Sequence, residues 1–135
     1  MASRQAAIKW GLAGAAAFIL AVGAGLAGTA SARSPQTELP MVAIGNLPAE
    51  ARSTYQLIHT GGPFPHAKDG TVFGNRERQL PPKSRGHYRE YTVKTPGSRD
   101  RGARRIVCGG EAPSAPQACY DTADHYASFS RIATQ

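Results

Sequence analysis

One segment of the chain has the hydrophobic spacing of an amphipathic helix. It opens with Asn46-Leu47-Pro48-Ala49-Glu50, where a capping-type residue is followed by a proline in the first turn and an early acid. Gly61-Gly62-Pro63 ends it, because glycine suits a left-handed cap and proline cannot continue a helix. Between these limits the apolar residues recur on one helical stripe: Leu47, Ala51, Tyr55 and Ile58, with Leu57 beside it. The pattern predicts a single helix.

Beyond the helix the period of the pattern changes to two. Residues 87–93 alternate between two sheet faces, with Tyr88, Glu90 and Thr92 on one and Arg89, Tyr91 and Val93 on the other. Residues 104–107 and 126–130 are predicted to form further strands. One helix followed by an antiparallel meander predicts the α+β class, with an N-terminal helix packed on a small antiparallel β-sheet.

The first 32 residues follow a third pattern. Arg4 and Lys9 precede an apolar stretch at 10–27, and small residues close the segment at 29–32. These are the parts of a secretory signal peptide, so we expect cleavage after Ala32 and a secreted, extracellular product. An uncleaved membrane anchor is the alternative, but the stretch is short and consists mostly of Ala and Gly.

The rest of the chain divides into two parts. Residues 33–45 are predicted to be a flexible leader, because Pro35 and Pro40 block regular structure. Residues 46–135 are long enough for one domain, and they contain no internal repeat.

Charge narrows the range of partners. The whole chain carries a net charge of +7, and loss of Arg4 and Lys9 with the signal segment leaves +5. A basic secreted domain is typical of proteins that meet an anionic partner, such as a nucleic acid, an acidic glycan or a membrane surface. Solubility alone would also explain the charge, so it does not decide between functions.

Two cysteines, Cys108 and Cys119, remain after export. An oxidising compartment favours a disulfide between them, and closing a loop of this length is worth about 3 kcal/mol in the chain-entropy model. Two cysteines at this spacing lack the paired arrangement of zinc ligands, so we expect no metal site.

A carboxylate within a strand, Glu90, is the first candidate for chemistry. If the next strand pairs antiparallel with this one, Arg105 projects from the same sheet face, and Arg101 lies in the connection close to it. Guanidinium groups bind phosphate oxygens, and a neighbouring carboxylate is placed to accept a proton from a hydroxyl. His125, where a loop enters the last predicted strand, is the candidate proton donor. An exposed ion pair at Glu90 is the structural alternative.

The segment Phe73-Gly74-Asn75-Arg76-Glu77 is the second candidate. Read locally it is a turn, because Gly and Asn tolerate positive φ. Such a bend also directs backbone N–H groups towards one acceptor, such as guanine O6, while Glu77 accepts from guanine N1 and N2. Phe73 or Tyr126 is placed to stack on an unpaired base.

These segments together resemble the barnase-like family of microbial guanyl-specific ribonucleases, most of all its small secreted bacterial members. The similarity runs from about Leu47 to Ile132. It rests on seven motifs in order: residues 62–65, 69–73, 75–77, 88–93, 95–97, 101–106 and 124–126. The two cysteines of this chain lie around the final loop. In some relatives the cysteines instead tie the two chain termini together.

The resemblance implies specific roles. Glu90 corresponds to the general base, His125 to the general acid, and Arg101 and Arg105 to a phosphate clamp. Glu77 corresponds to the guanine-binding carboxylate. The remaining positions implied to line the base or phosphate site are Phe73, Gly74, Asn75, Arg76 and Tyr126.

The expected activity is cleavage of single-stranded RNA 3′ of guanosine through a 2′,3′-cyclic phosphate. We expect no cofactor, no metal, and a monomer without stable membrane association. The resemblance implies a barstar-like protein inhibitor as a further partner. The alternative from another class is a secreted, non-catalytic basic module that binds nucleic acid or glycan. That module would not explain acidic residues placed among arginines, because each acid weakens polyanion binding.

Overall fold

The computed structural model describes residues 38–135. The predicted signal peptide and the first part of the predicted leader, residues 33–37, lie outside the described residues. Within residues 38–135 the structure contains no helix that is both long and apolar enough to cross a membrane.

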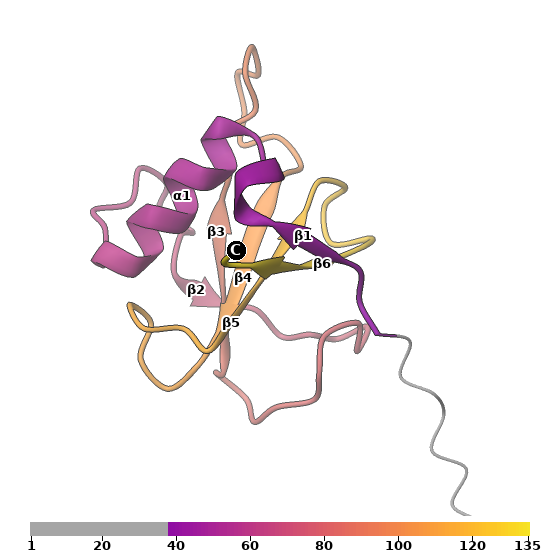
Figure 1. The fold of residues 1–135 in the computed structure, drawn as a ribbon. Coiled ribbons are helices and arrows are strands. Elements are labelled where there is room, and N and C mark those ends of the chain that lie inside the picture. Colours follow the sequence, from indigo (N-terminus) through magenta and orange to yellow (C-terminus); the bar gives the residue numbers. More distant parts are fainter. Residues whose placement is uncertain (1–37) are drawn as a thin grey trace, which may run out of the picture. The chain divides into compact units, whose positions relative to one another are not determined.

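The described residues form one helix and one six-stranded sheet (Figure 1). The sheet order is β1-β6-β5-β4-β3-β2, and every neighbouring pair is antiparallel except β1 and β6, which run parallel. The elements are β1 (Met41–Ala43), the 3-10 helix η1 (Ile44–Asn46), α1 (Ala49–Thr60), β2 (Thr71–Val72), β3 (Tyr88–Thr92), β4 (Arg105–Gly109), β5 (Ala118–Thr122) and β6 (Ser130–Ala133). The predicted α+β class is confirmed.

Helix α1 begins later than its sequence pattern suggests. Its N-cap is Pro48, with no capping hydrogen bond from a side chain, whereas the expected cap, Asn46, ends η1. Leu47 is extended, at φ −76° and ψ 152°, because the residue before a proline is excluded from the helical region. The predicted C-terminal end is confirmed, since Gly61 adopts φ 82° and its N–H donates to the Ile58 carbonyl.

The prediction of a flexible leader over 33–45 is wrong for its last five residues. Strand β1 pairs in parallel with β6, and Arg131 N–H donates to Pro40 O at 2.7 Å. Val42 and Ile44 pack against the hydrophobic core. Their partial burial orders this segment, although Pro40 and Pro48 stand on either side of it. A proline removes one donor but leaves a carbonyl that a neighbouring strand can use.

The last predicted strand, 126–130, is displaced. The structure has a turn at this place and a strand only from Ser130, because His125 and Tyr126 both adopt positive φ, at 54° and 69°. Strand β5 and the two-residue strand β2 were not predicted from the pattern. The predicted strands at 87–93 and 104–107 correspond to β3 and β4.

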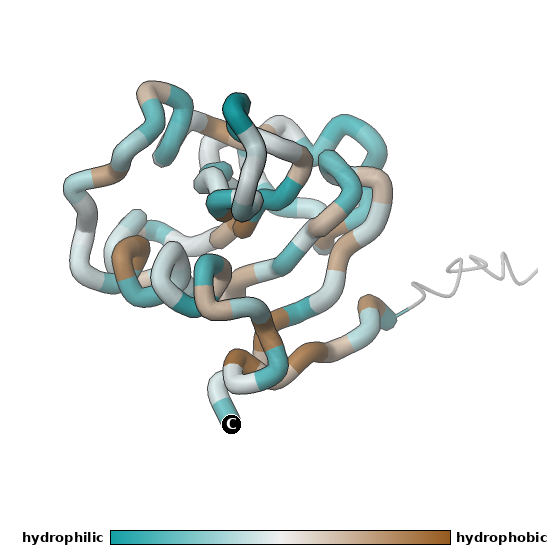
Figure 2. Tube along the Cα trace, turned by 90° about the horizontal axis from the view of Figure 1, so that it is seen from above, coloured by the Kyte–Doolittle hydropathy of each residue, from teal (hydrophilic) through white to brown (hydrophobic). Residues whose placement is uncertain are grey.

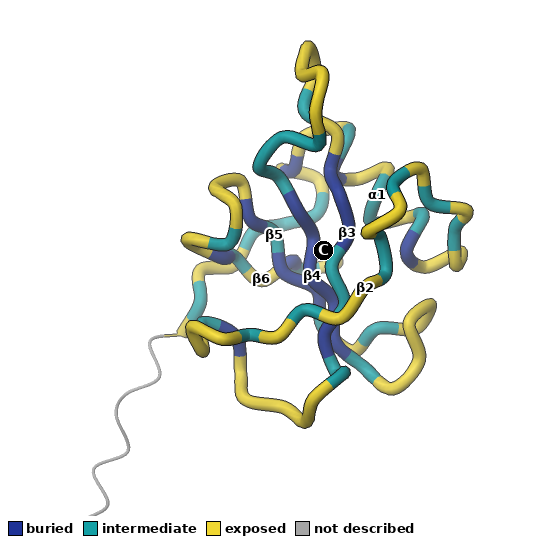
Figure 3. Tube along the Cα trace, turned by 180° about the vertical axis from the view of Figure 1, so that it is seen from behind, coloured by how far each residue is buried: buried dark blue, intermediate teal, exposed yellow. Residues whose placement is uncertain are grey.

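The sheet has two buried faces, which alternate along each central strand. One face meets α1 and carries Tyr91, Val93 and Ile106, together with the disulfide between Cys108 and Cys119. The opposite face carries a second apolar cluster, made of Leu80, Tyr88, Val107, Tyr120 and Phe129. Hydrophobic segments are short and separated by hydrophilic loops (Figure 2), and the buried residues gather in the central strands β3, β4 and β5 (Figure 3). The site described below lies on the face away from the helix.

Candidate active site

The register of two central strands brings Glu90 and Arg105 to the same sheet face. Thr92, two positions along β3 from Glu90, pairs directly with Arg105 of β4. Directly paired residues point the same way, and so do residues two apart along one strand. The sequence-based prediction that Arg105 shares a face with Glu90 is therefore confirmed by the pairing.

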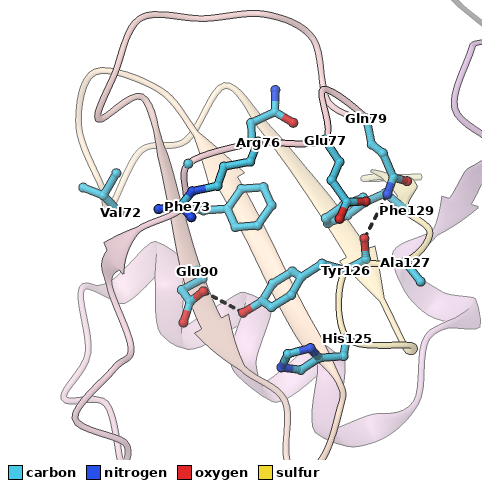
Figure 4. Close-up of a pocket in the computed structure, with 12 residues that line it drawn as sticks. Val72, Phe73, Arg76, Glu77, Gln79, Glu90, His125, Tyr126, Ala127 and Phe129 are labelled. Carbon is cyan, nitrogen blue, oxygen red and sulfur yellow. Dashed lines mark hydrogen bonds between the residues drawn. The ribbon is translucent and has the colours of Figure 1, made fainter.

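Glu90 is held by two side chains from other parts of the chain. Tyr126 Oη donates a hydrogen bond of 2.6 Å to Glu90 Oε2, drawn as a dashed line in Figure 4. Arg101 Nη2 lies 3.4 Å from Glu90 Oε1, and Arg101 Nε donates to Thr92 Oγ1 at 2.9 Å. One carboxylate oxygen thus faces a phenol and the other faces a cation.

The connection between β3 and β4, which projects beyond the sheet in Figure 1, is shaped to present Arg101. Asp100 Oδ1 accepts from Ser98 Oγ and from Gly102 N–H, both at 2.7 Å, and the Ser98 bond is the main reason that the pKa of Asp100 is lowered. Gly102 adopts φ 64°, and a Cβ there would lie 2.3 Å from Thr95 Oγ1. Only glycine fits this bend, so the backbone on both sides of Arg101 is fixed.

Arg105 is buried, with 3% of its surface exposed. Its Nη1 donates to the carbonyls of Gly102 and Arg104 at 2.9 and 2.8 Å. Its Nε is buried and has no hydrogen-bond acceptor in the part of the chain that the structure describes. A buried cationic donor without an acceptor is costly unless a ligand supplies one, and an oxyanion such as a phosphate fits this need.

The turn at 124–128 positions His125 and Tyr126. Asp124 Oδ1 accepts from Thr122 Oγ1 and Ser128 N–H, both at 2.9 Å, and Asp124 Oδ2 accepts from Ser128 Oγ. These bonds lower the pKa of Asp124, with the Ser128 hydroxyl as the largest cause. His125 N–H donates to Ala103 O at 3.0 Å, which ties the turn to the arginine-bearing connection. Positive φ at two successive non-glycine residues is sustained only because these bonds determine the turn.

One cavity of about 490 Å³ joins these groups (Figure 4). Eight of the residues predicted for the site line it: Phe73, Gly74, Asn75, Arg76, Glu77, Glu90, His125 and Tyr126. Arg101 and Arg105 do not line this cavity; Arg101 contacts Glu90 from outside it, and Arg105 projects from the same sheet face as Glu90. The structure therefore gathers all ten predicted residues around Glu90 and the cavity.

The loop at 73–80 forms the other wall of the cavity. Asn75 adopts φ 48°. Its side-chain amide forms two hydrogen bonds with the Leu80 backbone: Oδ1 accepts from Leu80 N–H at 3.1 Å, and Nδ2 donates to Leu80 O at 2.9 Å. Glu77 is exposed, and its side chain lies at the cavity wall (Figure 4). Gln79 Nε2 donates to Tyr126 O at 2.9 Å, so the loop is joined directly to the histidine-bearing turn.

Aromatic rings form the apolar part of the cavity. Phe73 stacks on Tyr126 with ring centroids 5.1 Å apart, and its edge meets Phe129 at 5.9 Å. Burial, followed by the hydrogen bond to Glu90, raises the pKa of Tyr126 to about 12. The phenol thus remains a hydrogen-bond donor at neutral pH. The rings were expected to stack on a base; in the structure they also support each other.

Four functional features were missed from the sequence. They are the bond from Tyr126 to Glu90, the Thr92 acceptor for Arg101, the Gln79 link and the wall residues Val72, Ala127 and Phe129. Each depends on side chains that meet across long separations, and no local spacing marks such a meeting. Asp124 could have been found as a turn residue, because Asp side chains commonly accept from backbone N–H groups of their own turn.

Among residues 38–135 no three His, Cys, Asp or Glu side chains are grouped closely enough to hold a metal ion.

The site of this small α+β protein combines a carboxylate, a phenol and an imidazole at one cavity with two guanidinium groups beside the carboxylate. Such a set of groups defines the class of acid–base enzymes that act on phosphate esters. Comparison with known proteins identifies the family within this class. A ribonuclease family model matches residues 30–133. The chain belongs to this ribonuclease family.

Named relatives agree with this assignment. Guanyl-specific ribonuclease Sa3 of Kitasatospora aureofaciens is 57% identical over 86 residues, which cover 64% of this chain and 58% of Sa3. Guanyl-specific ribonuclease Sa of the same organism is 54% identical over 91 residues, which cover 67% of this chain and 91% of Sa. The match thus spans less than two thirds of Sa3 but nearly all of Sa.

The fold has a close counterpart among solved structures. The crystal structure of ribonuclease Sa2 with guanosine-2′-cyclophosphate matches with a TM-score of 0.66 and 45% sequence identity. The match covers 73% of this chain and 99% of the other. The resemblance expected from the sequence is confirmed at the level of family and fold.

Proposed function

We propose that this protein is a guanyl-specific endoribonuclease that cleaves single-stranded RNA on the 3′ side of guanosine. The relatives Sa and Sa3 are guanyl-specific ribonucleases by name, and the Sa2 structure holds a guanosine cyclophosphate, the type of product that this reaction forms. The reaction is a transesterification that leaves a 2′,3′-cyclic phosphate, followed by hydrolysis of that ester.

Glu90 and His125 exchange the protons. Glu90 takes the proton from the ribose 2′-hydroxyl, and the freed oxygen attacks the adjacent phosphorus. The bond from phosphorus to the 5′-oxygen breaks, and His125 protonates that oxygen as it leaves. In the hydrolytic step water attacks the cyclic ester and the two residues exchange roles. Because the nucleophile belongs to the ribose, DNA lacks it and is not cut.

Arg101 and Arg105 stabilise the charge that builds on the phosphoryl oxygens. The buried Arg105 Nε, which has no protein acceptor among residues 38–135, supports this role because a phosphate oxygen would satisfy it. Arg101 is held by Thr92 and lies beside Glu90, so a phosphate bound by it is adjacent to the base.

The loop that carries Glu77 selects guanine. The Glu77 carboxylate accepts from N1–H and the N2 amine of guanine, while backbone N–H groups around Gly74, Asn75 and Arg76 donate to O6. Adenine has no N2 amine and presents a lone pair at N1, so it meets an unpaired carboxylate; such mismatches cost about 1–3 kcal/mol. Phe73 and Tyr126 provide apolar area for the base.

The single observation that carries the proposal is the pairing around Glu90. Tyr126 and Arg101 each hold one carboxylate oxygen, and His125 lines the same cavity. A surface ion pair would contribute at most about 1 kcal/mol to stability, which does not explain why two separate loops converge on this carboxylate.

Incubation with the dinucleotide GpC tests the proposal. The enzyme releases cytidine and guanosine 2′,3′-cyclic phosphate, in the presence or absence of EDTA, whereas a non-catalytic basic module leaves GpC intact. The same assay with ApC measures base selectivity, and deoxyguanosine in place of guanosine should abolish cleavage.

The setting of this activity is extracellular. The charged, apolar and small-residue pattern of residues 1–32 supports export with cleavage after Ala32, and the released protein is a monomer without stable membrane association. Family resemblance adds a barstar-like protein inhibitor to the proposed partners. N-terminal sequencing of the secreted protein tests the cleavage site.

A further inference from the structure

A second cavity lies on the same sheet face as the first. Its volume is about 570 Å³, and it extends from the N-terminal segment at Glu38, Leu39 and Met41 to Tyr120 on β5 and Arg131 on β6. Tyr120 and Arg131 are directly paired across the two strands, so both side chains point to one face. Glu90 on β3, Arg105 on β4 and this pair follow one another across that face.

The two cavities share one wall. Gln79 lines both of them, whereas Arg76 and Glu77 line the first and Arg78, Leu80 and Pro81 line the second. In Figure 4 Gln79 lies on the far side of the Phe73 and Tyr126 rings from Glu90. The two cavities are therefore neighbours separated by Gln79, and a nucleotide chain bound in the first would pass over Gln79 to reach the second.

Two guanidinium groups give the second cavity its charge. Arg78 and Arg131 are both exposed, and neither lies within ion-pair distance of an acid in the described part of the chain. Tyr120 and Arg131 are directly paired across β5 and β6; burial raises the pKa of Tyr120, and the neighbouring Arg131 charge opposes that rise. Glu38 is the single acid in the wall, which leaves the cavity with an excess of one positive charge.

We propose that the second cavity binds a backbone phosphate of the RNA outside the cleaved guanosine, through Arg78 and Arg131. This inference rests on the proposed ribonuclease function. Guanidinium groups suit phosphate oxygens, and each such contact releases counterions, so binding depends on salt. The phosphate can belong to the nucleotide on the 5′ side or to one on the 3′ side; both present the same chemistry.

The test compares three RNA substrates, GpC, UpUpGpC and GpCpUpU, with wild type, Arg78→Asn and Arg131→Gln. Asparagine tolerates the φ of 55° at position 78, and the Arg131 backbone bond to Pro40 does not involve the side chain. Arg52→Gln on α1 is the matched control, because it removes an exposed arginine that lines neither cavity. Circular dichroism melting confirms that each variant is folded.

We expect the wild type to cleave at least one extended substrate with a higher kcat/KM than GpC. Each cavity variant should lower kcat/KM on that substrate by about three- to tenfold and leave GpC unchanged, and it should weaken the slope of log kcat/KM against log salt by about 0.7. The substrate that shows the gain identifies the side of the phosphate. Arg52→Gln should match the wild type throughout.

Three results would overturn the inference. Extended substrates could be cleaved no faster than GpC, or the variants could cleave them as well as the wild type does. An equal loss on GpC would mean that the arginines act through the first cavity or through folding. If wild type fails to cleave GpC at all, the proposed function itself fails, which is a separate and recognisable result.

Discussion

The Tyr126 hydroxyl donates a 2.6 Å hydrogen bond to Glu90 across 36 positions of sequence. The same tyrosine stacks on Phe73 of the recognition loop, and its carbonyl accepts from Gln79. One residue therefore joins the carboxylate, the apolar wall and the loop that carries Glu77. This arrangement makes Tyr126 a positioning residue for Glu90 as well as a wall of the cavity.

Removing only this hydroxyl should slow the reaction. Tyr126→Phe keeps the ring and its stacking but leaves Glu90 Oε2 without its donor, so we expect kcat/KM on GpC to fall about tenfold, as for a hydrogen bond to a charged group. Because the pKa of Tyr126 is about 12, the wild-type bond persists throughout the neutral range. Tyr120→Phe is the matched control, because Tyr120 is buried on the same face and lines only the second cavity. Equal activity of Tyr126→Phe and wild type would remove this role.

Base selectivity should reside in Glu77. Glu77→Gln replaces an acceptor oxygen with an amide donor, so we expect a loss of about 1–3 kcal/mol in transition-state stabilisation on GpC. The ratio of kcat/KM for GpC to that for ApC should fall by a similar amount. Glu111→Gln, at an exposed position in the loop between β4 and β5, is the charge-matched control. A variant that loses rate equally on both substrates would assign Glu77 to catalysis or folding instead.

The Asp124 turn should control both rate and acid stability. Asp124→Ala removes the three hydrogen bonds that the carboxylate accepts, which should displace His125 and Tyr126. We expect kcat to fall by about ten- to hundredfold. Asp124→Asn keeps one acceptor oxygen and should lose less activity. Since the folded-state pKa of Asp124 is below its ordinary 3.8, its ionised form stabilises the fold above that value, and the contribution is lost as pH falls through the folded-state pKa. Melting temperatures from pH 2 to 7 should therefore converge for wild type and Asp124→Asn at the acid end. A constant difference would refute the titration argument.

The disulfide should matter for stability and not for chemistry. Cys108 and Cys119 lie on the helix side of the sheet, away from Glu90, and their bond closes a loop with a sequence separation of 11. We expect Cys108→Ala with Cys119→Ala to lower the free energy of unfolding by about 3 kcal/mol in urea titrations. The kcat of the folded protein on GpC should be unchanged. A large loss of kcat at a temperature where the variant is fully folded would contradict this separation.

How far the sequence predicts the fold depends on how local the signals are. The α1 stripe and its glycine cap, and the alternation along β3, are local, and both appear in the structure. β1 was missed because its order comes from pairing with β6 at the other end of the chain. The last strand was misplaced because the alternation of 126–130 does not reveal the positive φ of His125 and Tyr126, which Asp124 bonds sustain.

The candidate site follows the same division. The shared face of Glu90 and Arg105 could be derived from strand periodicity alone, because antiparallel pairing leaves few registers. His125, Arg101 and Glu77 were candidates by residue type and position, and the family resemblance supported their roles, since they lie on loops whose paths no periodicity describes. The bonds from Tyr126 to Glu90 and from Gln79 to Tyr126 required coordinates, because they join two loops and strand β3, which meet only after folding.

The most direct test of the central claim is single-turnover cleavage of GpC by wild type, Glu90→Gln and His125→Gln. Substrate binding is measured separately, by titration of a non-cleavable 2′-deoxy analogue. Positioned acid–base groups contribute about 10²–10⁴-fold, so each variant should lose activity on that order while its affinity for the analogue stays within a few-fold of wild type. Cleavage by either variant at the wild-type rate would contradict the assignment of Glu90 as base and His125 as acid.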